Sequence, residues 1–382
     1  MLKLTISKKS DDFRREFRIW LDNNPPPRSE DSSLEQFERV GRAWQAKLSS
    51  AQWVGIHWPT AYGGRGLSLV EEAIAQEELV RVSAPQILGL FGLTMVGPVL
   101  IRHGTASQKE RFLSRILSGE EIWCQGFSEP GAGSDLAAVK TRAVSVTGGY
   151  RISGQKIWTS FAHCADWCFV LCRTSEGARK HDGLSYLLVP MRSPGITTRP
   201  LRQISGDSEF NEVFFDDVFV PSENIVGLEG EGWKIAISTL MFERVVLTFS
   251  RQLQSEVALR DLLKRSSSSL SAAQKIGLAR CVVDACATRA LAYRHLVEYA
   301  AGKTPGPEGS MDKLMWSESF QRLCAFEVGL CGVEAALGET SAPHGAVLHR
   351  YLYSRGRTIA AGTSEIQRAI IAERLLGLPR SL

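Results

Sequence analysis

The chain has 382 residues, of which 44% are hydrophobic and 23% charged, values typical of a globular protein that buries a large core and divides into two or three sub-domains. Its 45 basic and 41 acidic side chains leave a formal charge of +4. Because no dense basic segment is interleaved with aromatic residues, we expect no nucleic-acid partner.

The eight cysteines form neither a Cys-x-x-Cys pair nor the spacing of a metal site. We therefore expect no disulfide and no zinc, and a reducing cytoplasm as the location. Cys164, Cys168 and Cys172 share parity on an expected strand, so they are predicted to be small buried hydrophobes. The apolar stretches are too short for a membrane span, and the first residues lack the core of a signal peptide.

The first third of the chain has helical periodicity. Four apolar residues recur at the spacing of one helix face: Phe13, Phe17, Trp20 and Leu21. The prolines at 25–27 end that helix, and a second long helix is expected over residues 71–82. The sequence predicts an N-terminal α-helical domain over residues 1–121.

The pattern then changes to short β-branched and aromatic runs. Gly148 and Gly149 indicate a hairpin turn between strands at 141–147 and 150–158. Three further strands are expected, at 166–174, 184–190 and 212–220. These features predict a small β-barrel domain over residues 122–226.

Helical patterns return after residue 230, with a serine-rich interruption at 266–269. We expect a C-terminal four-helix bundle over residues 227–382. The order helices, strands, helices predicts an α+β fold in which the barrel lies between two helical domains.

Two segments of the middle region favour a flat polar cofactor. Residues 123–135 read WCQGFSEPGAGSD, in which two glycines and a proline resist regular structure and allow a ligand to approach the backbone. Residues 154–160 read GQKIWTS and place an indole and a hydroxyl on one side of a strand. The glycine-rich loop alone is a weak signal, but its combination with the tryptophan strand is specific.

These two segments resemble the acyl-CoA dehydrogenase family of flavoproteins, as do three more: WPTAYGGRG at 58–66, FFDDVFVP at 214–221 and AAGTSEIQR at 360–368. The residues at 306–317 and 376–380 resemble a bacterial branch that includes subunits acting on steroid side-chain thioesters. The resemblance covers essentially the whole chain. It implies FAD as cofactor, acyl-CoA as substrate, electron transfer flavoprotein as acceptor and a trans-2-enoyl-CoA product. Whether the carrier is CoA or an acyl carrier protein stays open.

In the resembled family, a carboxylate removes a proton from the carbon next to the thioester. Many members carry it as the glutamate of Tyr-Glu-Gly-Thr, where this chain has Ala360 and Ala361. Other members place it on the first long helix of the last domain, before an arginine, and Glu243 followed by Arg244 fits that arrangement. Since the surrounding run is apolar, partial burial would raise the pKa of Glu243 towards a value useful for a base. A solvated, ion-paired glutamate is the alternative.

The resemblance implies that the backbone N–H of Ala361 binds the thioester oxygen and stabilises the developing enolate. The two small side chains at 360–361 also remove bulk beside the reacting carbons. We expect a pocket for a branched or polycyclic acyl group, unless neighbouring side chains fill the space.

By resemblance, six residues hold the flavin: Phe127, Ser128, Ser134, Trp158, Ser160 and Thr363. The first two face the pyrimidine edge and the third lies near the pyrophosphate. Trp158 covers the ring, Ser160 lies near N5, and Thr363 contacts the adenylate half at a helix N-terminus. The alternative for Trp158 is ordinary packing in the barrel core.

Two family motifs that contact a neighbouring subunit's FAD are missing, at 264–277 and 326–334. A homo-oligomer would therefore lack the charge partner for its own pyrophosphate. We expect either a hetero-oligomer, in which a sister subunit completes the FAD site, or a homo-oligomer with rearranged contacts. A flavin-dependent monooxygenase and a non-catalytic partner subunit are the alternative functions.

Overall fold

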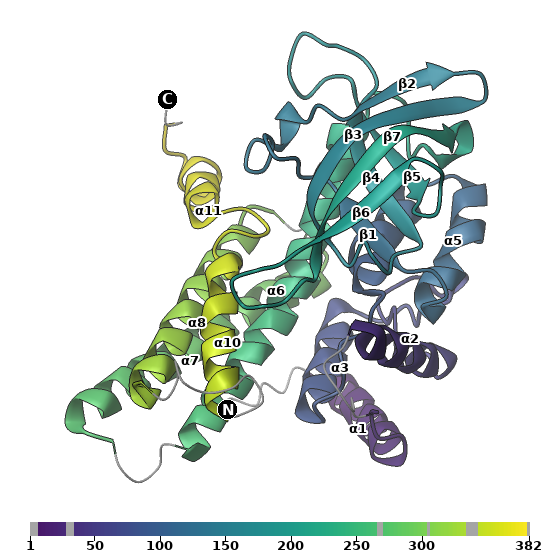
Figure 1. Cartoon of the computed structure of the whole chain (residues 1–382). Helices are drawn as coiled ribbons and strands as arrows, with labels where there is room; N and C mark the ends of the chain where they lie inside the picture. The colour runs from purple at the N-terminus through teal and green to yellow at the C-terminus, as the bar shows by residue number, and fades with distance from the viewer. Residues whose placement is uncertain (1–6, 28–33, 266–269, 304–305, 334–342, 380–382) are drawn as a thin grey trace.

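The computed structural model describes residues 7–27, 34–265, 270–303, 306–333 and 343–379, without the side chains of residues 34, 243–250 and 343–345. The protein consists of helices, then one curled sheet, then a second group of helices (Figure 1). The serine-rich interruption predicted at 266–269 lies outside the described residues. None of the helices in the described ranges is both long and apolar enough to cross a lipid bilayer.

The N-terminal helices cover one end of the sheet. In chain order, the helices and short helical segments are α1 (Lys8–Asn23), α2 (Leu34–Ser50), η1 (Thr60–Tyr62), α3 (Leu69–Arg81), η2 (Gly92–Val96), α4 (Gly97–His103) and α5 (Ala106–Ser118). Ser7 begins α1 by accepting a hydrogen bond from the Ser10 amide at 3.1 Å. The predicted apolar face is confirmed, since Phe13, Phe17 and Leu21 are buried and Trp20 is partly buried.

Within the residues that the structure describes, seven strands form one sheet in the order β1-β4-β2-β3-β7-β6, with β5 paired to β4. Their bounds are β1 (Trp123–Gly126), β2 (Arg142–Val146), β3 (Gly149–Ser160), β4 (Trp167–Arg173), β5 (Leu184–Pro190), β6 (Ile196–Leu201) and β7 (Phe210–Pro221). The predicted hairpin is confirmed by the antiparallel β2–β3 pair. Cys168 and Cys172 are buried in β4 as expected, but Cys164 lies before that strand and is only partly buried.

Strands β1 and β6 were not predicted. β1 is four residues long, and its pattern is hidden inside the glycine-containing motif. β6 pairs only with β7, and none of its residues is fully buried. Because β6 lies at the edge of the sheet and buries none of its side chains fully, its sequence carries little hydrophobic alternation.

The C-terminal helices form a bundle beside the sheet: α6 (Gly232–Arg265), α7 (Ala272–Ala300), α8 (Gly309–Cys331) and α10 (Pro343–Arg357). α6 begins behind the sheet and extends to the far end of the bundle (Figure 1). The chain ends in α11 (Ser364–Ile370) and η5 (Ile371–Leu375). α11 packs on α8 and lies apart from the sheet (Figure 1).

Candidate functional site: an exposed indole beside a glycine-containing loop

Four of the predicted cofactor residues lie on two adjoining segments. The chain leaves β1 at Gly126 and continues as Phe127 and Ser128 along β3. The Ile157 amide donates to the Ser128 carbonyl at 2.9 Å, and the Lys156 ammonium donates to the Phe127 carbonyl at 2.9 Å. These two bonds hold Phe127 and Ser128 beside the part of β3 that carries Trp158 and Ser160.

A bulge in β3 exposes Trp158. The pairing register between β3 and β7 shifts between Lys156 and Thr159, and Trp158 has a left-handed backbone with φ of +60°. Its side chain is 57% exposed and meets Phe210 edge-on, with ring centroids 6.0 Å apart. The alternative that this indole is a core residue of the β-domain is therefore wrong. An extra residue in a strand turns a side chain away from the regular alternation.

Ser134 lies in an exposed loop whose glycines have open surroundings. A Cβ added at Gly131 or Gly133 would meet no atom within 4 Å. Asp135 forms an ion pair with Lys180 at 2.7 Å and ties this loop to the chain after β4. The loop is therefore accessible to a ligand near Ser134, which is itself exposed.

The segment before α11 leaves backbone donors available. Ala361 and Gly362 have left-handed backbones, with φ of +57° and +90°. The Gln367 side chain donates to both of their carbonyls, at 2.9 and 3.2 Å, and so fixes the turn. In the described ranges, the Ala361 N–H has no hydrogen-bond acceptor. It is therefore free to bind an oxygen of a ligand, as the role expected for it requires.

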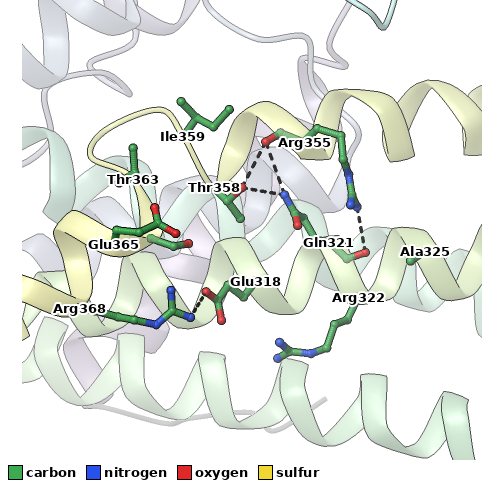
Figure 2. Close-up of a pocket in the computed structure, with 11 residues that line it drawn as sticks. Glu318, Gln321, Arg322, Ala325, Arg355, Thr358, Ile359, Thr363, Glu365 and Arg368 are labelled. Atoms are coloured by element: carbon green, nitrogen blue, oxygen red, sulfur yellow. Dashed lines mark hydrogen bonds and ion pairs between the residues drawn. The ribbon is translucent and has the colours of Figure 1, made fainter. Parts of the chain in front are cut away.

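Thr363 begins α11 as expected, accepting from the Ile366 amide at 3.2 Å. It lines a pocket of about 550 Å³ between α8, the end of α10 and α11 (Figure 2). The charged residues lining it are Glu318, Arg322, Arg355, Glu365 and Arg368. Guanidinium groups suit phosphate, although Arg368 already pairs with Glu318 and Arg322 with Asp284. The structure thus places Thr363 at the start of α11, on the helical bundle.

The remaining predicted residue, Glu243, lies in α6. The structure describes the backbone of Glu243 and Arg244 but not their side chains. The preceding turns of α6 bury Ile235, Ala236 and Thr239, and α6 packs on β5, η2 and α4. The catalytic role of Glu243 therefore stays a prediction.

Sequence reasoning missed a buried ion pair beneath the two segments that are predicted to hold the cofactor. The Lys156 ammonium lies 2.8 Å from the Glu129 carboxylate, and both side chains are buried. Both residues belong to the motifs described from the sequence. The available signal was a lysine inside an apolar strand, which requires a buried acceptor.

The arrangement around Trp158 fits one edge and one face of a flavin ring. An exposed indole on a strand offers an aromatic surface against which a planar ring can stack. Beside it, the Ser128 amide has no hydrogen-bond acceptor within the part of the chain that the structure describes. A planar ring that carries acceptors along its edge satisfies both features. No group of acidic, histidine or cysteine residues in the described ranges could hold a metal ion.

The chain matches three consecutive domains of one protein family. Residues 7–120 match the acyl-CoA dehydrogenase N-terminal domain, residues 124–218 the middle domain and residues 230–376 the C-terminal domain. It is 40% identical to the acyl-CoA dehydrogenase IpdE1 of Mycolicibacterium smegmatis, over 97% of this chain and 98% of that protein.

Two solved structures are similar along the whole chain. One is the ChsE4-ChsE5 complex from Mycobacterium tuberculosis, with a TM-score of 0.86, 28% identity and full coverage of both chains. The other is the steroid ACAD Tcur3481-Tcur3483, with a TM-score of 0.85, 27% identity and full coverage. The fold, the order of the motifs and the sequence identity therefore all indicate the same family. The chain belongs to the acyl-CoA dehydrogenase family and is an oxidoreductase that dehydrogenates acyl-CoA thioesters.

Proposed function

We propose that this chain is the base-bearing subunit of a heteromeric, FAD-dependent dehydrogenase that oxidises bulky acyl-CoA thioesters such as steroid side chains. The observation that carries the cofactor assignment is the exposed Trp158 on the β3 bulge, beside the unpaired Ser128 amide. Members of the family generally bind FAD. One solved relative is described as a steroid ACAD, and another is a complex of two differently named chains.

Six residues would hold FAD in this chain: Phe127, Ser128, Ser134, Trp158, Ser160 and Thr363. A bound flavin would supply the acceptor for the hydride that leaves the β-carbon of the acyl group. Glu243 takes the proton from the α-carbon, and the Ala361 N–H stabilises negative charge on the thioester oxygen. In support of the base, α6 enters the protein interior through Ile235 and Thr239, and the four-residue spacing continues this phase to position 243.

The small residues at 360–361 favour a bulky acyl group as substrate. The Ala361 N–H, which is proposed to bind the thioester oxygen, belongs to this segment. Ala360 and Ala361 occupy positions where many family members have a tyrosine and a glutamate. Both alanines are partly exposed. A turn held by Gln367 keeps the backbone donor in place without requiring side-chain bulk.

A sister subunit is favoured because this chain lacks the two motifs that contact a neighbour's FAD in the family. A buried pyrophosphate without cationic or backbone partners would be strongly destabilised. We expect a related chain to supply these groups, electron transfer flavoprotein to accept the electrons, and the assembly to work in the cytoplasm.

The test compares turnover of a panel of linear, branched and polycyclic acyl-CoAs with an artificial electron acceptor. Glu243→Gln keeps the shape but removes the proton acceptor, so we expect kcat to fall by at least about 10³-fold with retained substrate binding. Glu231→Gln, a partly exposed glutamate just before α6, is the matched control and should turn over normally.

A second variant separates loss of the base from loss of the fold. Adding Ala361→Glu to Glu243→Gln restores a carboxylate at the position other family members use, and part of the activity should return. Normal turnover by Glu243→Gln would contradict the role of Glu243. Equal kcat/KM for short linear and polycyclic thioesters would contradict the proposed substrate class. Rapid oxygen consumption by the reduced protein would favour the monooxygenase instead.

A further inference from the structure

Lys156 is a fully buried lysine in the middle of β3. Its ammonium donates three hydrogen bonds: to the Phe127 carbonyl at 2.9 Å, to Glu129 Oε1 at 2.8 Å and to the Leu171 carbonyl at 2.7 Å. Burial lowers the pKa of Lys156, and the Glu129 carboxylate opposes that shift. Three acceptors around one nitrogen can all be satisfied only by the protonated amine, because a neutral amine has two donors. The geometry therefore requires a buried positive charge.

Glu129 is held as firmly as its partner. Its Oε1 accepts from the Thr141 amide at 2.9 Å, and its Oε2 accepts from the Lys140 amide at 2.6 Å. Burial alone would raise the pKa of Glu129, but the Lys156 ammonium and these donors lower it overall. The ion pair thus joins the segment after β1 to β3, to β4 and to the start of β2. An ion pair with every position satisfied is the form of buried charge that a protein interior tolerates.

The ammonium acts on one particular peptide group. The Phe127 carbonyl and the Ser128 N–H belong to the same planar amide. Lys156 binds the oxygen of that amide, while the Ile157 amide fixes the next carbonyl, that of Ser128. A charge-assisted bond to a carbonyl draws electron density from the amide nitrogen and makes its N–H a stronger donor. In the described ranges that N–H has no acceptor.

We propose that Lys156 is a positioning residue that polarises the Phe127–Ser128 peptide towards the pyrimidine edge of the flavin. A polarised N–H stabilises a ring that gains negative charge more than it stabilises the neutral ring, because charge-assisted hydrogen bonds are the stronger ones. Lys156 therefore raises the reduction potential of the cofactor and holds the loop in its binding conformation. This inference rests on the proposed binding of FAD beside Trp158.

The test is the midpoint potential of the FAD-loaded protein, with wild type, Lys156→Met and Lys140→Met compared by equilibration against a reference dye. Lys156→Met keeps the length of the side chain and removes its charge. We expect its potential to fall by about 30 mV, which corresponds to a tenfold loss of preference for the reduced ring. Lys140→Met removes an exposed lysine next to the same network and should keep the wild-type potential.

A second variant tests the charge on the amine. Glu129→Gln removes the carboxylate that opposes the burial-lowered pKa of Lys156, so the potential, compared with wild type at the same pH, should rise while the amine keeps its proton and fall at higher pH once the proton is lost. The dissociation constant of oxidised FAD, measured by quenching of its fluorescence, is the accompanying readout. If both variants weaken FAD binding while the potential of retained FAD stays at the wild-type value, Lys156 is a packing residue only and the proposal is wrong.

Failure to fold by Lys156→Met leaves the pH dependence of the Glu129→Gln potential to decide. A Glu129→Gln potential equal to that of wild type at every pH would contradict the proposal. Failure of the proposed function gives a different result, because wild-type protein would then bind no FAD and would show no flavin absorbance in any assembly.

Discussion

At the residue scale, Trp158 combines backbone strain with exposure of a large apolar side chain. A non-glycine residue in the left-handed region costs about 1–3 kcal/mol and persists only where the surroundings impose it. Here they do. The buried Lys156 fixes the strand before the bulge, and the buried Asn211 fixes it afterwards by donating to the Thr159 carbonyl at 3.1 Å. The backbone strain is thus kept at Trp158, the residue that is expected to cover the flavin ring.

Replacing Trp158 by glycine separates binding from stability. Glycine adopts the left-handed backbone without strain but adds freedom to the unfolded chain, and the two effects nearly cancel. We expect the thermal midpoint of the apoprotein to stay within about 2 °C of wild type, while FAD affinity falls by at least about tenfold because the stacking surface is lost. Thermal unfolding and fluorescence titration measure the two quantities.

The matched control for Trp158→Gly is Phe219→Ala. Phe219 is another exposed aromatic residue of the sheet, on β7. Its truncation should leave FAD affinity unchanged. Equal loss of affinity in both variants would mean that Trp158 has no specific place in the cofactor site.

At the element scale, α1 and α3 are joined by a charge cluster around Glu78. The Glu78 side chain is buried and accepts hydrogen bonds from Arg14 at 2.7 Å, Arg18 at 2.7 Å and Arg81 at 2.7 Å. Burial opposes ionisation, but the hydrogen bonds from Arg18, Arg14 and Arg81 outweigh it, so the pKa of Glu78 lies below its ordinary value of 4.5. The Glu78 carboxylate thus contacts three guanidinium groups, and Glu77 also pairs with Arg14 at 2.7 Å.

The lowered pKa of Glu78 predicts an acid-sensitive contact. Since the folded pKa lies below the unfolded one, the stabilisation is complete above pH 4.5 and is lost as the pH falls through the lowered pKa. We expect Glu78→Gln to reduce the free energy of unfolding at pH 7 by about 1–3 kcal/mol. Urea unfolding from pH 7 to pH 3 should then show a smaller loss of stability in the variant than in wild type.

Asp12→Asn is the control for Glu78→Gln. Asp12 pairs with Arg15 on the exposed side of α1, where such pairs contribute little. Parallel pH profiles for wild type and Glu78→Gln would show that the Glu78 cluster does not set the acid response.

At the scale of the whole molecule, Arg289 ties together the helical regions that precede and follow the sheet in the chain. This residue of α7 donates to Glu77 of α3 at 2.7 Å and to Glu256 of α6 at 2.7 Å. The predicted division of the chain at 121/122 and 226/227 stays a prediction. The proposed completion of the FAD site by a sister subunit also belongs to this scale.

The chain purified alone should bind FAD weakly. A ligand at a hundredfold excess over its dissociation constant stabilises a protein by about 2.7 kcal/mol. In micromolar FAD we expect only a small fraction of that stabilisation for the isolated chain. Co-expression with a related chain that carries the missing motifs should restore it. Flavin content after gel filtration and the thermal midpoint give the result, and stoichiometric FAD in a homo-oligomer, seen by light scattering, would contradict the proposed sister subunit.

Local sequence was sufficient for the helices, the hairpin and the family. The buried face of α1 follows from apolar residues at helical spacing, and Gly148 and Gly149 mark the β2–β3 turn. The motifs at 123–135 and 154–160 carry the resemblance that the comparisons confirm. These features depend on residues close together in the chain, so the sequence records them directly.

Only the tertiary structure decided the environment of each site residue. The β3 bulge arises from pairing with β7, and it exposes Trp158 where the alternation of the strand would allow burial. Lys156 and Glu129 meet although they lie 27 positions apart in the chain, and Thr363 lines a pocket with residues of α8 and α10. Hydrogen-bond partners, burial and the balance of charge depend on which distant segments pack together, and a linear pattern does not contain that information.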